Sequence, residues 1–567
     1  MLAVKSWTVF CHCSIIKKFH NVNLPADGRR AAGDRRGYRH RKKGSAGSDA
    51  GGKPMASNSS NRLRTVLDRL PDGDAAALSG NLKVTKHLPE GVESKELYKD
   101  IIRIAWPSLV ELILTQLASM VDLMMVGQIG GSANPEMGAA AVTAVGLTTQ
   151  PKFLLMTAFM AMNTGVTALV ARYKGTGDMK KANLVVRQGL MFTFFATIIL
   201  SIIGVVFAEP MVIFMGSTEE QVTVWATQYL QIQMAGFITM AITSTITAAL
   251  RGVGDSRSSM IYNLIANLVN VFFNWMLIYG NLGMPELDVA GASIATVIGQ
   301  FVAFCISMVL LVRGNGFLKL QFKLGFKPHK ETLLDLLNIG LPAMIEQLLM
   351  RAGMIIFSRT VAGLGTVPYA THQVCMNIQA LSFMTGQAFA VSSTTLMGQS
   401  LGKRRPDMAQ AYCSRTRRVG MGCAIVIALV FIFFGRYIVE LYNSTPEIVE
   451  TGARILLIVA VLQPLQTSQF IIAGGLRGAG DTRATAVITF ITVLLVRPAV
   501  AIILINYTSL GLYGAWIAMA CDQLLRSTLV LLRFQSGKWK TIRMYSETNS
   551  AADKAEEREL EEELETE

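Results

Sequence analysis

Charged residues are scarce in this chain of 567 residues. Asp, Glu, Lys and Arg make up 16% of it, whereas soluble globular domains carry about 25%. Apolar residues make up 51%, and the mean hydropathy is +0.40. This composition excludes an ordinary soluble protein.

Paired cysteines and nucleotide-binding motifs are also missing. The seven cysteines are scattered, so we expect no disulfide framework. The "CHC" at Cys11–Cys13 has no second pair to complete a zinc site. The chain has no GK[ST] phosphate loop and no catalytic constellation. We therefore expect that the protein is not an enzyme, is not driven by ATP hydrolysis and binds no cofactor.

The net charge of +14 does not indicate a nucleic-acid partner, because charges of opposite sign gather at the two ends. Residues 1–54 hold 12 Lys or Arg and three Asp, whereas residues 551–567 hold nine acids and two bases. We expect both ends to be largely disordered. The basic end fits an organellar presequence, and it equally fits spurious coding upstream of a start at Met55.

Long apolar runs are what the chain does contain, and runs near 20 residues can cross a membrane. Twelve helical spans are predicted: 101–126, 139–171, 184–208, 222–250, 258–280, 289–312, 334–360, 369–400, 412–435, 449–475, 484–505 and 511–533. Every second loop contains Lys or Arg. The remaining loops contain neither, and Arg436 is the one exception. Since Lys and Arg favour cytoplasmic loops, this alternation places both termini in the cytoplasm.

An octapeptide occurs twice in nearly the same form. "LRGVGDSR" spans Leu250–Arg257 and "LRGAGDTR" spans Leu476–Arg483. Such an echo indicates internal duplication. We expect an all-α polytopic membrane protein of 12 transmembrane helices, in two six-helix lobes related by a pseudo-two-fold along the membrane normal. The predicted parts are a disordered extension (1–96), an N-terminal lobe (97–314), a cytoplasmic linker (315–332), a C-terminal lobe (333–536) and an acidic tail (537–567).

Each octapeptide is interpreted as a turn between the fourth and fifth spans of its half. Its glycines suit the end of one helix, and Asp255 or Ser256 suits the N-cap of the next. In the second copy, Asp481 and Thr482 are expected to act in the same way.

Two polar stripes run along spans of the first half. The first span carries residues at i, i+4, i+8 and i+11: Glu111, Thr115, Ser119 and Asp122. The fifth span carries four amides: Asn263, Asn267, Asn270 and Asn274. Buried polar groups need partners away from lipid. The stripes therefore suit a shared hydrated cavity, although asparagine stripes also serve as interhelical contacts.

The two halves resemble the multidrug and toxic compound extrusion (MATE) family. The resemblance covers residues 97–540 and rests on Pro and Glu in each first span, the octapeptide, "MVDLMMVGQIG" at Met120–Gly130, and "SFMTGQAFAVSSTTLMGQSLG" at Ser382–Gly402, which is similar to bacterial members. It implies a V-shaped pair of lobes that exports small molecules by alternating access in exchange for protons or sodium ions.

The resemblance also implies that Asp122 is the cation-binding carboxylate. Cation coupling is accordingly expected at Asp122, Asn270, Asn274, Asn267 and Ser119. One branch of the family carries an acid where this chain has Asn274, so proton and sodium both fit as the coupling ion. No metal is expected beyond sodium at Asp122.

The substrate cavity is expected to involve polar groups of both halves: Glu111, Thr115, Glu346, Arg351 and Arg497. Glu111 and Glu346 occupy matching positions, which fits either an architectural or a functional role. Asp522 and Arg526, spaced i, i+4, are expected to pair. His372 is expected to be a packing residue.

Two alternatives accompany the antiporter hypothesis. The same superfamily includes flippases of lipid-linked precursors, and a receptor or scaffold acting through the acidic tail is a third class. The expected partners are a small-molecule substrate and the lipid bilayer, with the protein acting as a monomer in the cell membrane, or in an organelle if residues 1–54 are a presequence.

Overall fold

The structure is a computed structural model that describes residues 92–130, 134–217, 219–314, 316–320, 327–442 and 445–542. All of these residues belong to one compact unit, Leu63–Glu567. The predicted basic extension up to residue 91, with the proposed presequence, and the acidic tail beyond residue 542 lie outside the described residues.

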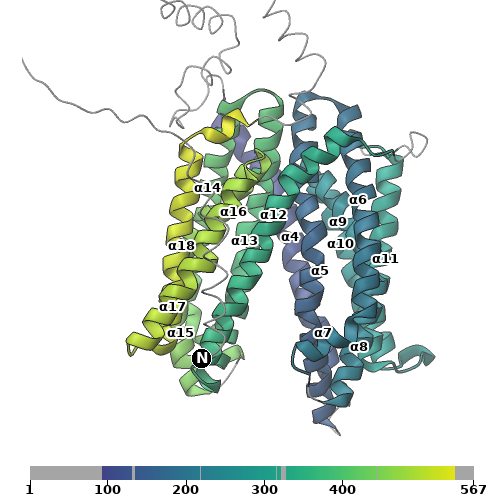
Figure 1. The fold of residues 1–567 in the computed structure, drawn as a ribbon, viewed down its shortest axis with the longest axis vertical. Helices are drawn as coiled ribbons and strands as arrows, with labels where there is room; N and C mark the ends of the chain where they lie inside the picture. The colour runs from purple at the N-terminus through teal and green to yellow at the C-terminus, as the bar shows by residue number, and fades with distance from the viewer. Residues whose placement is uncertain are drawn as a thin grey trace, which may run out of the picture. The chain divides into compact units, whose positions relative to one another are not determined.

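The described chain folds almost entirely into helices, which Figure 1 shows as two groups. The first half contains α4 (Ser94–Gly127), α5 (Pro135–Thr176), α6 (Met179–Val206), α7 (Ala208–Phe214), α8 (Glu220–Ala235), α9 (Phe237–Val253), α10 (Ser256–Ile278) and α11 (Asp288–Arg313). The second half contains α12 (Lys330–Ala362), α13 (Thr366–Gly402), α14 (Pro406–Tyr442), α15 (Pro446–Gly478), α16 (Thr482–Thr489), the π-helix η4 (Phe490–Val496), α17 (Arg497–Tyr507) and α18 (Gly511–Gln535).

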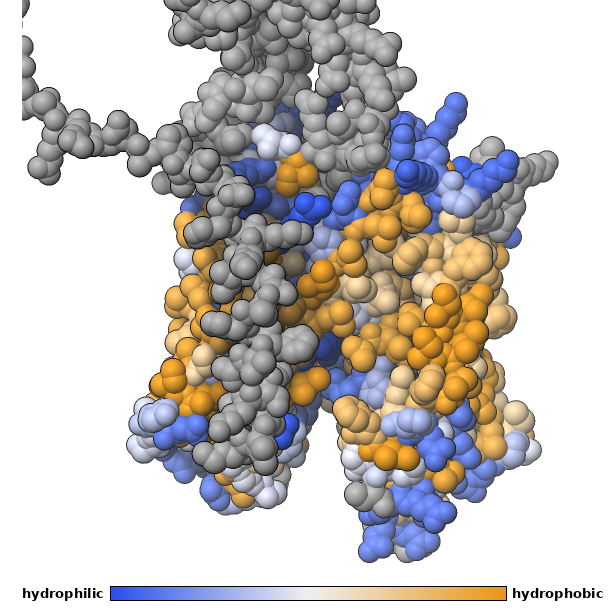
Figure 2. All heavy atoms as spheres, viewed as in Figure 1, coloured by the Kyte–Doolittle hydropathy of each residue, from blue (hydrophilic) through white to orange (hydrophobic). Residues whose placement is uncertain are grey.

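The helices are long and apolar enough to cross a membrane, as the fold prediction required. Within the described residues there are 11 such spans, and the bent pair α8–α9 makes a twelfth. Figure 2 shows hydrophobic residues along the sides of the helices and hydrophilic residues towards both ends. Helices suit this environment because they satisfy their own backbone hydrogen bonds within the span. The all-helical, polytopic fold class is confirmed.

The fourth span bends where a single continuous helix was expected. The axes of α8 and α9 differ by 50°, and Gly236 lies at the break. A Cβ atom on Gly236 would lie 2.6 Å from the side chain of Val297 on α11. Glycine therefore allows α11 to approach the bend more closely than any other residue would.

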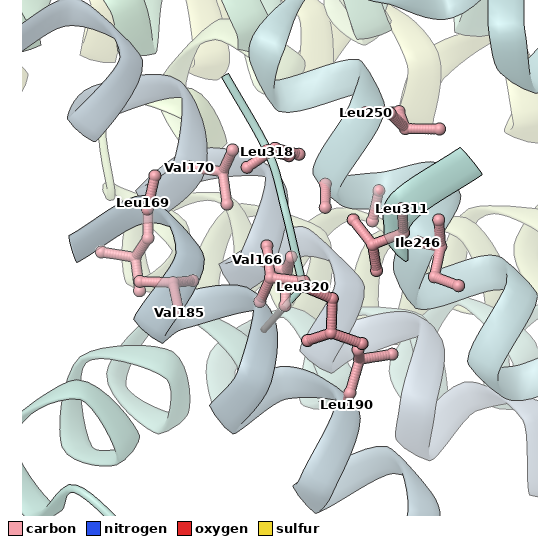
Figure 3. Close-up of a cluster of buried hydrophobic side chains, with 14 of the residues drawn as sticks. Val166, Leu169, Val170, Val185, Leu190, Ile246, Leu250, Leu311, Leu318 and Leu320 are labelled. Atoms are coloured by element: carbon pink, nitrogen blue, oxygen red, sulfur yellow. The ribbon is translucent and has the colours of Figure 1, made fainter. Parts of the chain in front are cut away.

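A large apolar core lies in the first half (Figure 3) and extends to α12 of the second half. It joins side chains of α5, α6, α9, α10 and α11, including Val166, Leu190 and Ile246, to Leu336 and Ile339 of α12. Leu318 and Leu320, which follow α11, are buried in the same core. The predicted linker therefore begins with residues that anchor it to the first half.

The two halves contact each other through α4 and α5 on one side and α12 and α13 on the other. At Gly175 and Gly402 the backbones of α5 and α13 meet directly. A Cβ atom on Gly402 would lie 1.9 Å from the carbonyl oxygen of Arg172, and one on Gly175 would lie 2.1 Å from that of Gln399. The close crossing of α5 and α13 therefore requires glycine at both positions.

The duplicated octapeptides form the same turn in both halves. Gly254 (φ 94°) and Gly480 (φ 88°) adopt the left-handed conformation that ends a helix. The following caps differ. Asp255 accepts a hydrogen bond from the backbone N–H of Ser258 and caps α10, as predicted. Asp481 makes no such cap, because it pairs with Arg533 at 2.7 Å; the prediction for the second copy was wrong.

Candidate functional site

Glu111 on α4 is buried and accepts three hydrogen bonds. Arg251 donates at 2.8 Å, Asn263 at 2.7 Å and Ser259 at 3.0 Å. Arg251 is the second residue of the first octapeptide, so Glu111 ties the duplicated turn to α4. A buried carboxylate with these donors has its charge compensated.

The matching position in the second half is organised differently. Glu346 on α12 is buried and accepts a hydrogen bond from Thr485 at 2.9 Å. Arg477, which matches Arg251, instead donates to the carbonyl oxygen of Ala473 on its own helix at 3.3 Å. Both halves therefore keep the glutamate and the arginine, but the ion pair between them forms only in the first half among the described residues.

Asp122 lies eleven positions beyond Glu111 on α4 and faces two amides of α10. Asn274 donates to one carboxylate oxygen at 2.5 Å. With its amide turned so that both ends are satisfied, Asn270 donates to the two oxygens at 2.8 and 3.2 Å and accepts from Thr296. Asn270 and Asn274 are both buried. The structure thus brings together three of the five residues predicted for cation coupling.

The other two predicted residues lie elsewhere. Ser119 donates to the carbonyl oxygen of Thr115 on its own helix, and Thr115 donates to that of Glu111. Asn267 is partly buried on α10, between Asn263 at Glu111 and Asn270 at Asp122. The asparagines of α10 therefore donate hydrogen bonds to two carboxylates, Glu111 and Asp122, rather than to one.

Lys152 on α5 is a charged residue within a span of the first half that sequence reasoning missed. Its ammonium donates to the side-chain oxygen of Gln233 on α8 at 2.9 Å. A signal was present in the sequence, because Lys152 is the one charged residue between Glu136 and Arg172. Ionisable residues within a span are functional candidates.

The second half contains a buried charged cluster. Arg497 donates to Asp522 at 2.5 and 3.0 Å, and Arg526 lies 3.5 Å from the same carboxylate. The predicted pairing of Asp522 with Arg526 is therefore present, with Arg497 as the closer partner. The π-helix η4 ends directly before Arg497, and such segments are common at functional sites.

Two further predicted residues are placed by aromatic contacts. Arg351 on α12 lies 4.6 Å from the ring centroid of Phe153 on α5, so it spans the two halves. His372 packs against Phe357 and Trp516, in agreement with its predicted packing role. Within the described ranges, no three His, Cys, Asp or Glu side chains converge as a metal site.

Comparison with known proteins identifies the family. The profile of the MatE family matches residues 107–276 and 342–503. The probable multidrug resistance protein NorM of Thermotoga maritima is 28% identical over 449 residues, covering 79% of this chain and 94% of the relative. The multidrug resistance protein MdtK of Yersinia enterocolitica is 26% identical over 443 residues, covering 77% and 95%.

Solved structures show the same fold. An outward-facing multidrug resistance MATE family transporter of the MOP superfamily superposes with a TM-score of 0.72 at 20% identity, covering 81% of this chain and all of that one. A MATE structure in complex with MaD3S has a TM-score of 0.71 at 21% identity, covering 79% and 97%. The family profile, which matches more than half of the chain, establishes that the chain belongs to the MATE family of multi-pass membrane transporters, which are not enzymes.

Proposed function

We propose that this chain is a secondary antiporter that exports small organic compounds in exchange for an inward-moving cation. Asp122 is the coupling group, and Asn270 and Asn274 hold it. The observation that carries the proposal is a partly buried carboxylate that joins α4 to α10 through two amides. The multidrug names of the relatives support the substrate class.

Neutralisation of Asp122 provides the coupling step. An ionised Asp122 attracts the amide N–H groups of α10. A bound cation removes that attraction, which changes the energy of packing α4 against α10 and biases the lobe conformation. A ligand shifts such an equilibrium only by its differential affinity for the two states.

The driving force is sufficient for export against a gradient. One charge moving through 100 mV releases about 2.3 kcal/mol. At about 1.4 kcal/mol per factor of ten, this supports roughly 40-fold accumulation.

The orientation follows from where the halves meet. Thr395 and Gln399 on α13 donate to the backbone oxygens of Arg251 and Gly252 in the first octapeptide. This end carries the basic loops, so the positive-inside rule assigns it to the cytoplasm, together with both termini. The described conformation is then closed to the cytoplasm, and the protein acts as a monomer in the cell membrane.

The substrate cavity is proposed to lie between the halves, with Arg351 and the Arg497 cluster on the second. Glu111 is assigned an architectural role instead, since its oxygens are occupied by Arg251, Ser259 and Asn263. A lipid-precursor flippase is disfavoured, because it needs several uncompensated cations, whereas Arg497 and Arg526 share the carboxylate of Asp522.

The test is transport of a fluorescent multidrug substrate by purified protein in proteoliposomes. With an imposed cation gradient, Asp122→Asn should abolish coupled efflux and leave the protein folded, as judged by size-exclusion chromatography. Unchanged gradient-driven efflux by this variant would contradict the proposal. Movement of a labelled lipid-linked precursor across the same bilayer would favour the flippase.

A further inference from the structure

We propose that the exported substrate is an organic anion, and that the guanidinium of Arg351 binds its carboxylate in the space between the two halves. The inference rests on the proposed antiport function and deepens it by naming the substrate class. Its basis is a cation within a span that lies against an aromatic ring of the other half and has no carboxylate beside it among the described residues.

Arg351 lies on the face of α12 that meets the first half. That face crosses α5 at Gly340, where a Cβ atom would lie 3.3 Å from the carbonyl oxygen of Ala161. Eleven residues return to nearly the same side of a helix, so Arg351 shares the face of Gly340. Its guanidinium carbon lies 4.6 Å from the ring centroid of Phe153 on α5. Both side chains are partly exposed, so the guanidinium is accessible from the space between the halves.

No carboxylate compensates this guanidinium within the part of the chain that the structure describes. Glu346 is the nearest acid along α12, but five residues place it about 140° around the helix, and it accepts a hydrogen bond from Thr485. Asp122 accepts from amides of α10. An arginine keeps its charge and five N–H donors in proteins, and a charge within a span needs a partner or water. Arg351 is therefore available to an incoming anion.

Amides lie on the neighbouring faces of α5 and α13. Gln150 lies eleven positions before Ala161, and Gln387 lies eleven positions before Gly398, where α13 packs against α5. Each amide therefore shares the face that meets the other half. That face is buried at Ala161 and Gly398 but exposed at Gln150 and Gln387. In Figure 2 the surface divides between the two groups of helices towards one end, and hydrophilic residues lie where the groups part. Since amides avoid lipid, we assign both to this space.

An organic anion matches these groups better than an organic cation does. A carboxylate accepts two parallel N–H bonds from a guanidinium, and the amides can bind further polar substituents. Leu154, next to Phe153, is exposed and offers apolar contact. Lys152, on the other side of Phe153 in the chain, adds a second positive charge to this turn of α5. A cationic substrate would meet two like charges here, which disfavours its binding.

The charge of the substrate also decides how the membrane potential acts on transport. When an anion leaves and a cation enters, both movements carry positive charge inward, so an inside-negative potential favours both. When a cation leaves in exchange for another of equal charge, the two movements cancel. An anionic substrate therefore lets the potential assist its own export in addition to the entry of the coupling cation.

The first experiment measures binding to the purified full chain by fluorescence anisotropy. The probes are a diethylaminocoumarin carboxylate, its neutral carboxamide and its cationic aminoethyl amide, which share one fluorophore. The wild type should bind the carboxylate about tenfold or more tightly than either amide, the effect of hydrogen bonds to a charged group. Equal binding of the three probes, or preference for the cationic one, would overturn the proposal, and this comparison needs no variant.

Three substitutions then assign the preference to Arg351. Arg351→Gln should weaken binding of the carboxylate about tenfold or more and leave binding of the neutral carboxamide unchanged. Arg351→Lys keeps the charge without the planar fork and should bind the carboxylate with intermediate affinity. Arg436→Gln removes the same charge from an exposed position on α14 and should bind all three probes as the wild type does. Wild-type affinity for the carboxylate in a folded Arg351→Gln variant would contradict the assignment.

Transport of the same probes separates this inference from the proposed function. In proteoliposomes with a fixed cation gradient, an inside-negative potential should speed efflux of the coumarin carboxylate. If the carboxylate binds through Arg351 but no cation gradient drives its efflux, the antiport proposal fails and the anion site stands. If Asp122→Asn abolishes coupled efflux of a multidrug dye while Arg351→Gln leaves binding of the carboxylate unchanged, the anion site is wrong and the antiport proposal stands.

Discussion

The amide nitrogen of Asn274 on α10 lies 2.5 Å from a carboxylate oxygen of Asp122 on α4, although 152 positions separate the two residues in the chain. This contact joins the first and fifth spans of the first half at the group proposed to carry the transported charge. It also leaves the side-chain oxygen of Asn274 without a hydrogen-bond partner among the described residues. Both residues are therefore direct targets for substitution.

Asn274→Asp should raise the pH range over which transport operates. The substitution places a second carboxylate in contact with Asp122, and two such groups cannot both be ionised without strong repulsion. The pair therefore retains one proton to higher pH than Asp122 does alone. The check is the pH profile of efflux in proteoliposomes. A variant profile that coincides with the wild-type profile would contradict the assignment of Asn274 to the coupling site.

Arg251→Met should destabilise the protein more than Arg477→Met, although the two arginines hold matching places in the duplicated octapeptides. Removing one partner of a buried ion pair costs about 3–5 kcal/mol. The loss here should be smaller, because Arg251 is 21% exposed. Arg477 donates to a backbone carbonyl of its own helix, so its loss strands no carboxylate. Melting temperatures in detergent compare the two variants, and equal losses would contradict the asymmetry.

The sequence predicted the spans and the position of Asp122 for clear physical reasons. Long apolar runs identify membrane helices on their own, and an interval of eleven residues on a helix returns to nearly the same face. Glu111 and Asp122 therefore share a face of α4, and the amides of α10 had to be buried somewhere. Hydrophobicity therefore predicts the spans, and helical periodicity predicts which polar residues share a face.

The sequence did not show which partners each polar residue would choose. Lys152 and Gln233 are separated by 81 positions and meet through tertiary packing of α5 against α8, which has no local pattern. Likewise, the two octapeptides are nearly identical, yet Asp255 caps a helix and Asp481 pairs with Arg533. Their neighbours in space, rather than their own sequence, decide this difference.

Gly402→Ala should impair the cytoplasmic closure of the two halves. The new Cβ atom would lie 1.9 Å from the carbonyl oxygen of Arg172, so α5 and α13 would have to separate. Gly422→Ala on α14 is the matched control, since its Cβ atom would meet nothing within 4 Å. Reduced transport and a lower melting temperature are expected for the first variant. If both glycine variants behave alike, the crossing of α5 and α13 is not needed for closure.

Asp522→Asn should strongly destabilise the second half. Asp522 is fully buried and compensates Arg497 and Arg526, so its neutralisation leaves two buried cations, at a cost of about 3–5 kcal/mol. Replacing the closer arginine as well, in Arg497→Met with Asp522→Asn, should recover part of that loss. Melting temperatures of the two single variants and the double variant form the test. Additive losses would show that Arg497 and Asp522 are not coupled.

Truncation of the C-terminal region should have opposite consequences on the two sides of Ile542. Arg172 on α5 donates to the carbonyl oxygen of Ile542 at 3.2 and 3.3 Å, and the buried Trp539 stacks on Phe534 with ring centroids 5.5 Å apart. Deletion of residues 546–567 keeps both contacts, so transport and melting temperature should stay at wild-type levels. Deletion of residues 537–567 removes both contacts and should lower the melting temperature, because it exposes apolar surface on α18 and removes the hydrogen bonds that Arg172 donates to Ile542. Loss of transport in the shorter deletion, with the fold intact, would instead assign the acidic residues a direct part in the transport cycle.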